Sequence, residues 1–472
     1  MPATDKERTT FSTACFSGKY LTGNLNPGAP GRRPGERMPF QTVGMEVMHS
    51  LRRMMRALGA GLAVGAGLGL LARRGLNRRM AFGPWGSLGR GRGLPGGVDG
   101  VSLALMQSTA ASMVGGNRLV WRDNGEVFTA IEEAFRAARH SIHVDVYIWR
   151  PGQPGERLAA LACRRAREGV AVRILVDPMG SPGFAEHLYP RLVEAGCEVH
   201  YFRPPEDYPL AFTGRNHRKL VVVDGRVGIT GGFGIAPEWN GNGLSPDGWR
   251  ESSVEVEGPV VRQMQVAFAN HWMETGGPML PAAEFERAQP AGGARAAYVT
   301  STDVKGLSHA RWVTHIALAA ARQRVWIANA YFVPPPQVLG ALCARPALGV
   351  ELRLLLPGPY QDHPSVTFIQ RRFYRRLERS GVKVYEYQPS MMHAKTMLVD
   401  DRIVVVGSIN LDFLSMEYLE EGSLVVDDHA FAADFEKRWR VDMSRSREVT
   451  SGGRVRNPPG QELEPQLFTH SL

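Results

Sequence analysis

The chain has few cysteines, and they are scattered. Four occur in 472 residues, at Cys15, Cys163, Cys197 and Cys343, and none lies in a CxxC pair. This argues against a disulfide framework and against a structural zinc site. We therefore expect small incidental thiols in a reducing compartment. We expect no metal and no other cofactor, because no group of metal-ligating residues stands out either.

Acidic residues are nearly missing from the stretch between Arg32 and Arg92. It holds twelve arginines, no lysine and only two acids, Glu36 and Glu46. This excess of ten equals the net charge of the whole chain, +10, so the remaining sequence is close to neutral. A protein that follows a nucleic-acid backbone would carry its excess on the folded domain. An arginine-rich extension suits anionic lipid headgroups better, which favours a membrane surface as partner.

The chain also lacks an apolar run of full membrane-spanning length. Residues 57–72 are apolar and flanked by arginines, but they include five glycines. As a helix they would reach about 24 Å, short of the roughly 30 Å of a hydrocarbon core. A marginal span, an interfacial helix and a flexible extension stay open, whereas the missing A-x-A pattern disfavours a secretory signal. We predict a disordered basic extension over 1–44, a membrane-associating segment over 45–80 and a linker over 81–112.

An internal repeat begins near residue 113. Four segments recur in the same order at offsets of 176 to 185 residues. The pairs are 141–152 with 324–335, 169–181 with 349–361, 196–204 with 381–389, and 216–232 with 392–408. The repeat predicts two homologous halves, 113–292 and 293–442, followed by a tail over 443–472.

Short β-branched runs alternate with amphipathic stretches throughout both halves. This alternation predicts an α/β fold in which mixed sheets are flanked by helices. Two homologous halves in one chain can pack about a pseudo-two-fold axis, which would bring equivalent motifs together at the interface.

Each half ends its repeat with the same polar signature. His and Lys two residues apart on a strand point to the same face and can address one phosphate. A single such pair could be a structural histidine and a solvated lysine, but two at matching points of a repeat indicate chemistry. The two motifs are His217-x-Lys219-x4-Asp224, followed by Gly231-Gly232, and His393-x-Lys395-x4-Asp400, followed by Gly407-Ser408-x-Asn410.

Residues 113–440 resemble the phospholipase D superfamily with its paired HKD motifs. The segments 330–334, AYFVP, and 407–412, GSINLD, resemble the bacterial cardiolipin synthase branch. The resemblance implies that one imidazole attacks phosphorus, giving a covalent phosphohistidine, while the other acts as general acid and base. It makes His217 the nucleophile and His393 the acid/base, although pseudo-symmetry leaves the reverse order open. The catalytic set so implied is His217, Lys219, Asp224, His393, Lys395 and Asp400.

The same resemblance implies acidic partners that orient the imidazoles. Glu251 and Glu421 occupy the matching places downstream of the two motifs, and Glu420 is the alternative to Glu421. Gly232, Ser408 and Asn410 would lie close to the phosphate. The first motif departs from the family pattern, because Gly234 stands where Asn is usual. This substitution removes one amide donor and puts catalytic efficiency in doubt.

We therefore predict a phosphatidyltransferase that joins two phosphatidylglycerols into cardiolipin and releases glycerol. Two alternatives remain: a phospholipase D-type hydrolase of phospholipid, less favourably of nucleic acid, and a non-catalytic lipid-binding relative. The predicted partners are an anionic phospholipid substrate, phosphatidylglycerol, and a membrane surface, with no nucleic acid. The predicted location is the bacterial inner membrane, where the chain is peripheral or anchored by its N-terminal segment.

Overall fold

The computed structural model describes residues 93–208, 214–302 and 308–450. All of them belong to one structural unit, Gly75–Leu472. The predicted basic extension over 1–44 and the apolar segment over 45–80 lie outside the described residues. Within the described ranges, no helix combines the length and the apolar character needed to cross a membrane.

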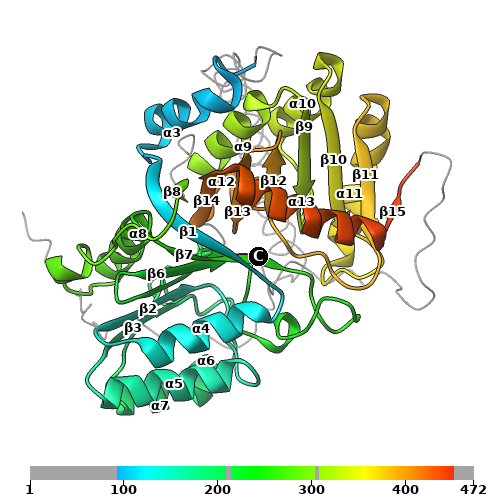
Figure 1. Ribbon diagram of the computed structural model, residues 1–472. Coiled ribbons are helices and arrows are strands. Elements are labelled where there is room, and N and C mark those ends of the chain that lie inside the picture. Colours follow the sequence, from blue (N-terminus) through cyan, green and yellow to red (C-terminus); the bar gives the residue numbers. More distant parts are fainter. Residues whose placement is uncertain (1–92, 209–213, 303–307, 451–472) are drawn as a thin grey trace, which may run out of the picture. The chain divides into compact units, whose positions relative to one another are not determined.

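The first half alternates strands and helices as the periodicity predicts (Figure 1). Its strands are β1 (Val114–Asp123), β2 (Ser141–Val146), β3 (Ala171–Val176), β4 (Glu198–Tyr201), β5 (Lys219–Val223), β6 (Val227–Gly231) and β7 (Ser252–Glu257). Its α-helices are α4 (Glu126–Ala137), α5 (Gly155–Arg167), α6 (Phe184–His187), α7 (Tyr189–Glu194) and α8 (Val261–Glu274). Two short 3-10 helices, η2 (Pro237–Trp239) and η3 (Ala282–Glu284), lie in its loops.

The second half repeats this order. Its strands are β8 (Ala294–Ser301), β9 (Arg324–Ala328), β10 (Glu351–Pro357), β11 (Lys383–Tyr387), β12 (Thr396–Val399), β13 (Ile403–Gly407), β14 (Glu421–Asp427) and β15 (Ser446–Glu448). Its helices are α9 (His309–Ala320), α10 (Pro336–Ala344), η4 (Pro346–Leu348), α11 (Pro364–Arg379), α12 (Phe413–Glu417) and α13 (His429–Ser444).

The strand order makes the internal symmetry explicit. The described strands form one continuous sheet in the order β15-β11-β10-β9-β12-β13-β14-β8-β1-β7-β6-β5-β2-β3-β4. Read outward from the centre, each strand of the first half is matched by the strand numbered seven higher in the second. The pseudo-two-fold axis therefore passes between β1 and β8, which pair antiparallel with a shift in register between Val114 and Asn117. The predicted fold class, two homologous halves of mixed sheet and helix, is confirmed.

Three apolar cores hold the layers together. One lies between the first-half sheet and α4 to α7, and a second lies between the second-half sheet and α9 to α11. The third contains residues of α8, α13 and the strands of both halves, including Trp121, Leu220, Leu398 and Trp439. Because this core is shared, the halves meet through buried apolar surface at their motif-bearing strands.

The predicted linker and tail are partly ordered. Residues within the predicted linker 81–112 form η1 (Gly97–Gly100) and α3 (Val101–Thr109). Val101 and Leu105 of α3 are buried against the second-half core because they lie four residues apart on one helix face. Residues within the predicted tail complete α13 and add β15, which pairs antiparallel with β11. Both segments belong in part to the folded body.

Candidate active site

The two motifs start at equivalent points. His217 lies two residues before the first residue of β5, and His393 lies three residues before the first residue of β12. These strands are buried along their whole length, as their apolar sequences predict. The His217 N–H donates to the carbonyl of Glu420 at 2.9 Å, and the His393 N–H donates to the carbonyl of Arg250 at 2.7 Å. Each motif is therefore positioned by backbone of the opposite half. Because the next residue in each case is a glutamate, a carboxylate is brought beside each imidazole.

The histidine–glutamate pairs cross between the halves. Nδ1 of His217 lies 2.9 Å from Oε1 of Glu421, and Nδ1 of His393 lies 2.5 Å from Oε2 of Glu251. All four side chains are buried. A carboxylate at Nδ1 favours the tautomer protonated there, which leaves the Nε2 lone pair available to act on a substrate. The structure places Glu421, not Glu420, beside the imidazole.

Two lysines enter the same pocket. The Lys219 ammonium donates to the His217 carbonyl at 2.7 Å, and that of Lys395 donates to the His393 carbonyl at 2.5 Å. Nζ of Lys395 also lies 2.9 Å and 3.0 Å from the two ring nitrogens of His393. Each lysine faces a tyrosine ring, Tyr147 at 5.6 Å from Lys219 and Tyr331 at 5.9 Å from Lys395.

Burial governs the protonation of these groups. It lowers the pKa of Lys219 to about 7 and that of Lys395 to about 8, against the opposing charges of Glu421 and Glu251. Burial also raises the pKa of Glu251 to about 7 and that of Glu421 to about 8. An anionic phosphate between the lysines would favour their charged forms, because opposite charges attract strongly in a low-dielectric pocket.

The charged groups of each motif act on the imidazole of the other. Burial is the largest cause that lowers the pKa of both His217 and His393 well below its usual value. The charges of Lys219 and Lys395 act on each imidazole, and the charge of His217 also acts on His393. Groups separated by a domain would not influence one another in this way. Burial thus favours the neutral form of both imidazoles, which suits a nucleophile, whereas the imidazole that acts as an acid must first take up a proton.

The two glutamates have different neighbours. Glu421 receives hydrogen bonds from the hydroxyls of Ser408 and of Ser415, the latter at 2.5 Å. On the first-half side, Gly232 lies opposite Glu251, and a Cβ at Gly232 would come within 2.6 Å of the carboxylate oxygens. A side chain at Gly232 would therefore displace Glu251, so Ser408 has no counterpart there.

Trp239 fills the space left by the glycine in the first motif. A Cβ at Gly234 would lie 2.8 Å from Cζ3 of Trp239, so the indole takes the place of the usual asparagine side chain. Nε1 of Trp239 lies 3.3 Å from Nδ1 of His393, and its hydrogen bond also lowers the pKa of Glu251 against the effect of burial. Because the proton on Nδ1 is directed at Glu251, the indole N–H is best placed to donate to that carboxylate.

Sequence reasoning missed Trp239 although a signal was present. The offset of 176 that relates Gly234 to Asn410 also relates Trp239 to Ser415. Both Trp239 and Ser415 donate toward the glutamate of their own half. The repeat could therefore have identified the indole as the counterpart of the Ser415 hydroxyl, which donates to Glu421 in the second half.

Aromatic side chains surround His393 more closely than His217. Ring centroids of Trp249, Trp239 and Tyr331 lie 4.8, 5.2 and 5.9 Å from that of His393. For His217 the one aromatic ring contact recorded among the described residues is with Tyr147 at 5.7 Å. The two halves of the pocket are therefore chemically distinct despite their common fold.

Asn410 is buried, and its backbone N–H donates to the Ser415 hydroxyl at 3.2 Å. Its side-chain oxygen has no hydrogen-bond partner among the described residues. This oxygen is an acceptor, so a hydrogen bond from Asn410 to a phosphate, which also only accepts, would have to come from the amide NH2 group.

Asp224 and Asp400 do not lie in the pocket, and their predicted catalytic role is corrected here. Asp224 accepts the backbone N–H groups of Arg139, His140 and Ser141 at 2.7–2.9 Å. Asp400 accepts the corresponding groups of residues 322–324 at 2.8–3.2 Å. Each follows the far end of its strand, roughly 17 Å from the lysine at about 3.3 Å per residue, and fixes the turn that leads into β2 or β9.

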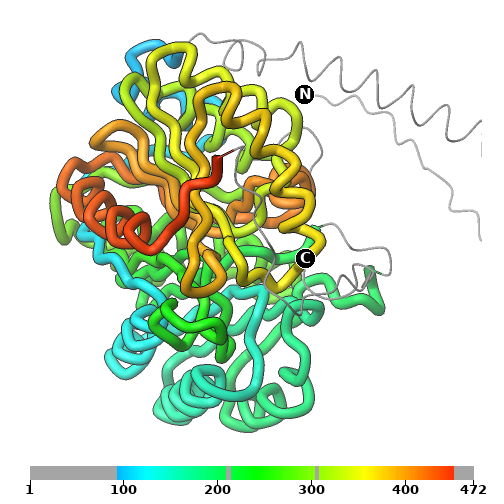
Figure 2. The backbone as a smooth tube through the Cα atoms, turned by 90° about the vertical axis from the view of Figure 1, so that its right-hand side faces the viewer, coloured from blue at the N-terminus to red at the C-terminus, as the bar shows by residue number. Residues whose placement is uncertain are grey.

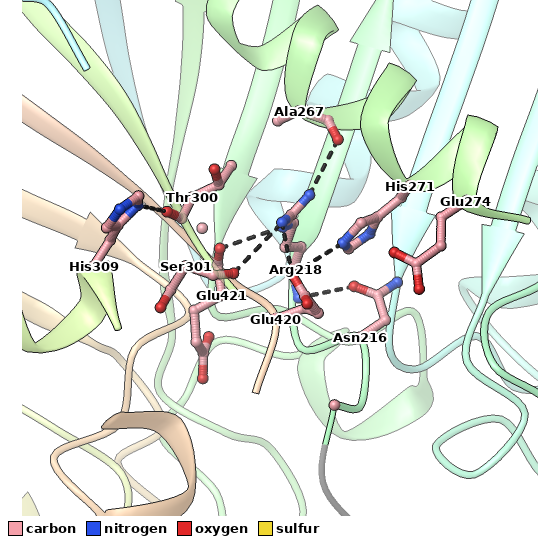
Figure 3. A network of polar contacts seen from close by, with 12 residues as sticks. Asn216, Arg218, Ala267, His271, Glu274, Thr300, Ser301, His309, Glu420 and Glu421 are labelled. Atoms are coloured by element: carbon pink, nitrogen blue, oxygen red, sulfur yellow. Dashed lines mark hydrogen bonds and ion pairs between the residues drawn. The ribbon is translucent and has the colours of Figure 1, made fainter. Parts of the chain in front are cut away.

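A polar network surrounds Arg218, the residue that follows His217 in the chain (Figure 3). Glu420 pairs with Arg218 at 2.9 Å and with Nε2 of His271 at 3.3 Å. Nδ1 of His271 is 3.0 Å from Asp145. Burial raises the pKa of Glu420, but the His271 hydrogen bond and the Arg218 charge outweigh it and hold the pKa at about 2. The Arg218–Glu420 pair joins the two halves, and both of its residues are chain neighbours of the His217–Glu421 pair.

No group of three or more His, Cys, Asp or Glu side chains in the described part of the chain is arranged to hold a metal ion. The described cysteines, Cys163, Cys197 and Cys343, are not disulfide-bonded.

Comparison with known proteins agrees with this geometry. The family model described as "Cardiolipin synthase, PLD-like domain" matches residues 131–272 and 315–442, more than half of the chain. The chain belongs to this family. The match covers both halves of the repeat, so the predicted membership of the phospholipase D superfamily, in its cardiolipin synthase branch, is confirmed.

Named relatives extend over most of the sequence. Cardiolipin synthase A of Pseudomonas aeruginosa (strain LESB58) is 33% identical over 389 residues, covering 80% of this chain and 79% of the relative. Cardiolipin synthase 2 of Bacillus anthracis is 30% identical over 332 residues, covering 69% of this chain and 64% of the relative. The crystal structure of phosphatidylserine synthase from Haemophilus influenzae Rd KW20 has a TM-score of 0.57 at 13% identity. It covers 74% of this chain and 92% of that one, and it supports the fold alone.

Proposed function

We propose that this protein is a phospholipase D-type phosphatidyltransferase that makes cardiolipin from two phosphatidylglycerols. The observation that carries the proposal is the pair of crossed histidine–glutamate contacts beside two buried lysines. The similarity to cardiolipin synthase A, over 80% of this chain and 79% of the relative, supports the substrate class. Its place of action is the bacterial inner membrane, where the basic and apolar N-terminal sequence would hold it.

In the first step, Nε2 of His217 attacks the phosphorus of one phosphatidylglycerol. The P–N bond forms as the bond from phosphorus to the headgroup glycerol oxygen breaks. His393 enters this step protonated on both ring nitrogens and gives its Nε2 proton to the leaving glycerol oxygen. Lys219 and Lys395 neutralise the non-bridging oxygens, and the amide NH2 of Asn410 donates to one of them, while the Ser408 hydroxyl stays bound to Glu421. Gly232 has no side chain and therefore leaves room for the Glu251 carboxylate.

In the second step, His393 removes a proton from the glycerol hydroxyl of a second phosphatidylglycerol. That oxygen attacks the phosphohistidine, the P–N bond breaks, and cardiolipin leaves with His217 restored. The order of the two imidazoles follows the family resemblance, and the closer aromatic enclosure of His393 shows that its surroundings differ from those of His217.

A product assay tests this proposal. Purified protein incubated with phosphatidylglycerol should yield cardiolipin and glycerol, and full activity should persist in EDTA because the lysines supply the positive charge. Phosphatidic acid as the main product would indicate hydrolysis, and lipid binding without turnover would indicate a scaffold.

The nucleophile can be identified separately. Quenching during turnover in denaturant at neutral to mildly alkaline pH preserves the acid-labile P–N bond. Peptide mass spectrometry should then find the phosphatidyl adduct on the His217 peptide and no adduct in His217→Ala. An adduct on His393 would reverse the assigned order.

A further inference from the structure

Helix α11 presents a basic face to solvent. Besides Pro364 and Ser365 in its first turn, the exposed residues of this helix are Phe368, Arg372, Arg375, Arg376 and Arg379. Their spacing of three and four residues places them on one side of the helix, over about 16 Å. The opposite side is buried through Gln370, Tyr374 and Leu377. We name these five exposed residues the α11 face.

The charges of the α11 face are not neutralised within the described structure. No carboxylate of the described residues lies within ion-pair distance of its four arginines, whereas neighbouring Arg371 pairs with Glu386 at 3.0 Å. The guanidinium of Arg372 lies 5.0 Å from the ring centroid of Phe368, which is 56% exposed. The face therefore combines free positive charge with an apolar side chain at one end.

Phe368 lies toward the N-terminal end of α11, which is the end nearer the active site. The helix starts at Pro364, two residues after Asp362, and Asp362 accepts a hydrogen bond from the Tyr331 hydroxyl at 2.7 Å. The Tyr331 ring in turn lies 5.9 Å from that of His393. Phe373 of α11 packs on Phe332 at 6.2 Å. Figures 1 and 2 show α11, in yellow, on the outside of the second half beside β11.

A second exposed aromatic side chain lies on the same side of the pocket. Phe413, 47% exposed, follows Asp412, which forms a backbone bridge with Val333, two residues from Tyr331. Phe368 and Phe413 thus both belong to segments that border the Tyr331 side of the site.

We infer that the α11 face is a docking surface for an anionic phospholipid bilayer. Arginines bind lipid phosphates, and aromatic rings enter the headgroup region, so a basic stripe ending in an exposed ring fits a membrane interface. Docking there would hold the pocket against the lipid layer that contains the substrate. The inference rests on the proposed phospholipid substrate, because that substrate gives the charge complementarity its partner.

A depth measurement in the full chain tests the docking directly. Phe368→Trp, mixed with phosphatidylglycerol vesicles containing bromolipid, should show added fluorescence quenching beyond the nine native tryptophans. Val193→Trp, at a position 44% exposed on α7 of the first half, is the matched control and should show none. Equal quenching at both positions, or none at Phe368, would overturn the inference.

Charge reversal tests the arginines. The variant Arg375→Glu/Arg376→Glu/Arg379→Glu should lower activity on phosphatidylglycerol vesicles at least 10-fold, since each basic residue contributes about five-fold to binding. Turnover of a short-chain, monomerically dissolved phosphatidylglycerol should stay within two-fold of the parent, which also shows that the variant is folded. Arg164→Glu/Arg167→Glu, exposed on α5, should leave both activities unchanged.

The outcomes separate the two proposals. No cardiolipin from any protein, the parent included, would contradict the proposed function, while the quenching still reports on docking. Unchanged vesicle activity in the α11 variant would contradict the docking. If the α11 variant lost more binding to duplex RNA or DNA than to vesicles, that result would also contradict the docking, because nucleic acid would then be the partner.

Discussion

At the scale of single residues, one glycine and one tryptophan set the first half of the site apart from the second. Gly234 leaves room that the Trp239 ring occupies at 2.8 Å from the position of a Cβ. The second half has Asn410 and Ser415 at the matching places. The loss of an asparagine and the gain of an indole are therefore one coupled change.

This coupling predicts a rescue. Gly234→Asn should lower kcat at least 10-fold, because the new side chain must displace Trp239 from beside His393 and Glu251. Gly234→Asn combined with Trp239→Ser reproduces the arrangement of the second half and should recover most of the loss in a cardiolipin assay.

Trp239→Ser alone is the control, because it removes the ring without refilling the space. A Gly234→Asn variant as active as the parent, or a double variant no better than the single one, would contradict the coupling.

The buried glutamates predict a pH effect on stability. Burial raises the pKa of Glu421 from 4.5 to about 8. A raised native pKa contributes stability that is complete below the unfolded value and is lost as pH rises through the native one. The advantage of the parent over Glu421→Gln in free energy of unfolding should therefore shrink between pH 5 and pH 8, by about 1–3 kcal/mol.

Urea unfolding of both proteins at the two pH values measures this difference. A difference that is constant with pH would mean that Glu421 titrates alike in the native and unfolded chains.

At the scale of elements, the internal repeat was enough to predict which residues of the two halves correspond. The paired motifs fixed His217 and His393 as partners, and the downstream positions of Glu251 and Glu421 followed from the family pattern. The crossing of these pairs depends on β5 and β12 meeting the start of β14 and β7 from the opposite half. No local pattern in the sequence carries that information.

The error over Asp224 and Asp400 has the same origin. The sequence motif groups the lysine and the aspartate because they are close in the chain. In the structure a strand lies between them, and five residues of extended chain place the aspartate at the opposite end of that strand. The linker prediction failed for a related reason, because Val101 and Leu105 are buried by α9, which lies two hundred residues further along the chain.

The turn role of Asp224 makes a further prediction. Asp224→Asn should lower the free energy of unfolding by about 1–3 kcal/mol, because it weakens three charge-assisted backbone hydrogen bonds. Its kcat should stay within about three-fold of the parent, whereas His393→Ala should lose essentially all turnover. Thermal unfolding and the cardiolipin assay together separate stability from chemistry, and a large loss of kcat in a stable Asp224→Asn protein would return Asp224 to the reacting groups.

At the scale of the whole molecule, two buried ion pairs cross between the halves beside the histidine–glutamate pairs. Arg218 of the first half pairs with Glu420 at 2.9 Å, and Arg250 of the first half pairs with Asp442 at 2.8 Å. In both cases the first half supplies the cation and the second half the anion. Breaking one such pair leaves an uncompensated buried charge.

Glu420→Ala should therefore destabilise the protein by about 3–5 kcal/mol. Arg218→Met/Glu420→Met, which removes both charges and keeps side-chain volume, should recover much of that loss in chemical unfolding. If both variants were equally stable, the pair would not hold the halves together.

The crossed dyads also constrain how such a protein can be divided or evolve. Each half owns an imidazole whose carboxylate belongs to the other, so neither half alone contains one working acid–base couple. Separately expressed halves would be inert until they reassociate, and a change that improves one couple must be made in two distant stretches of the gene. Selection on this enzyme therefore acts on the halves as a matched pair.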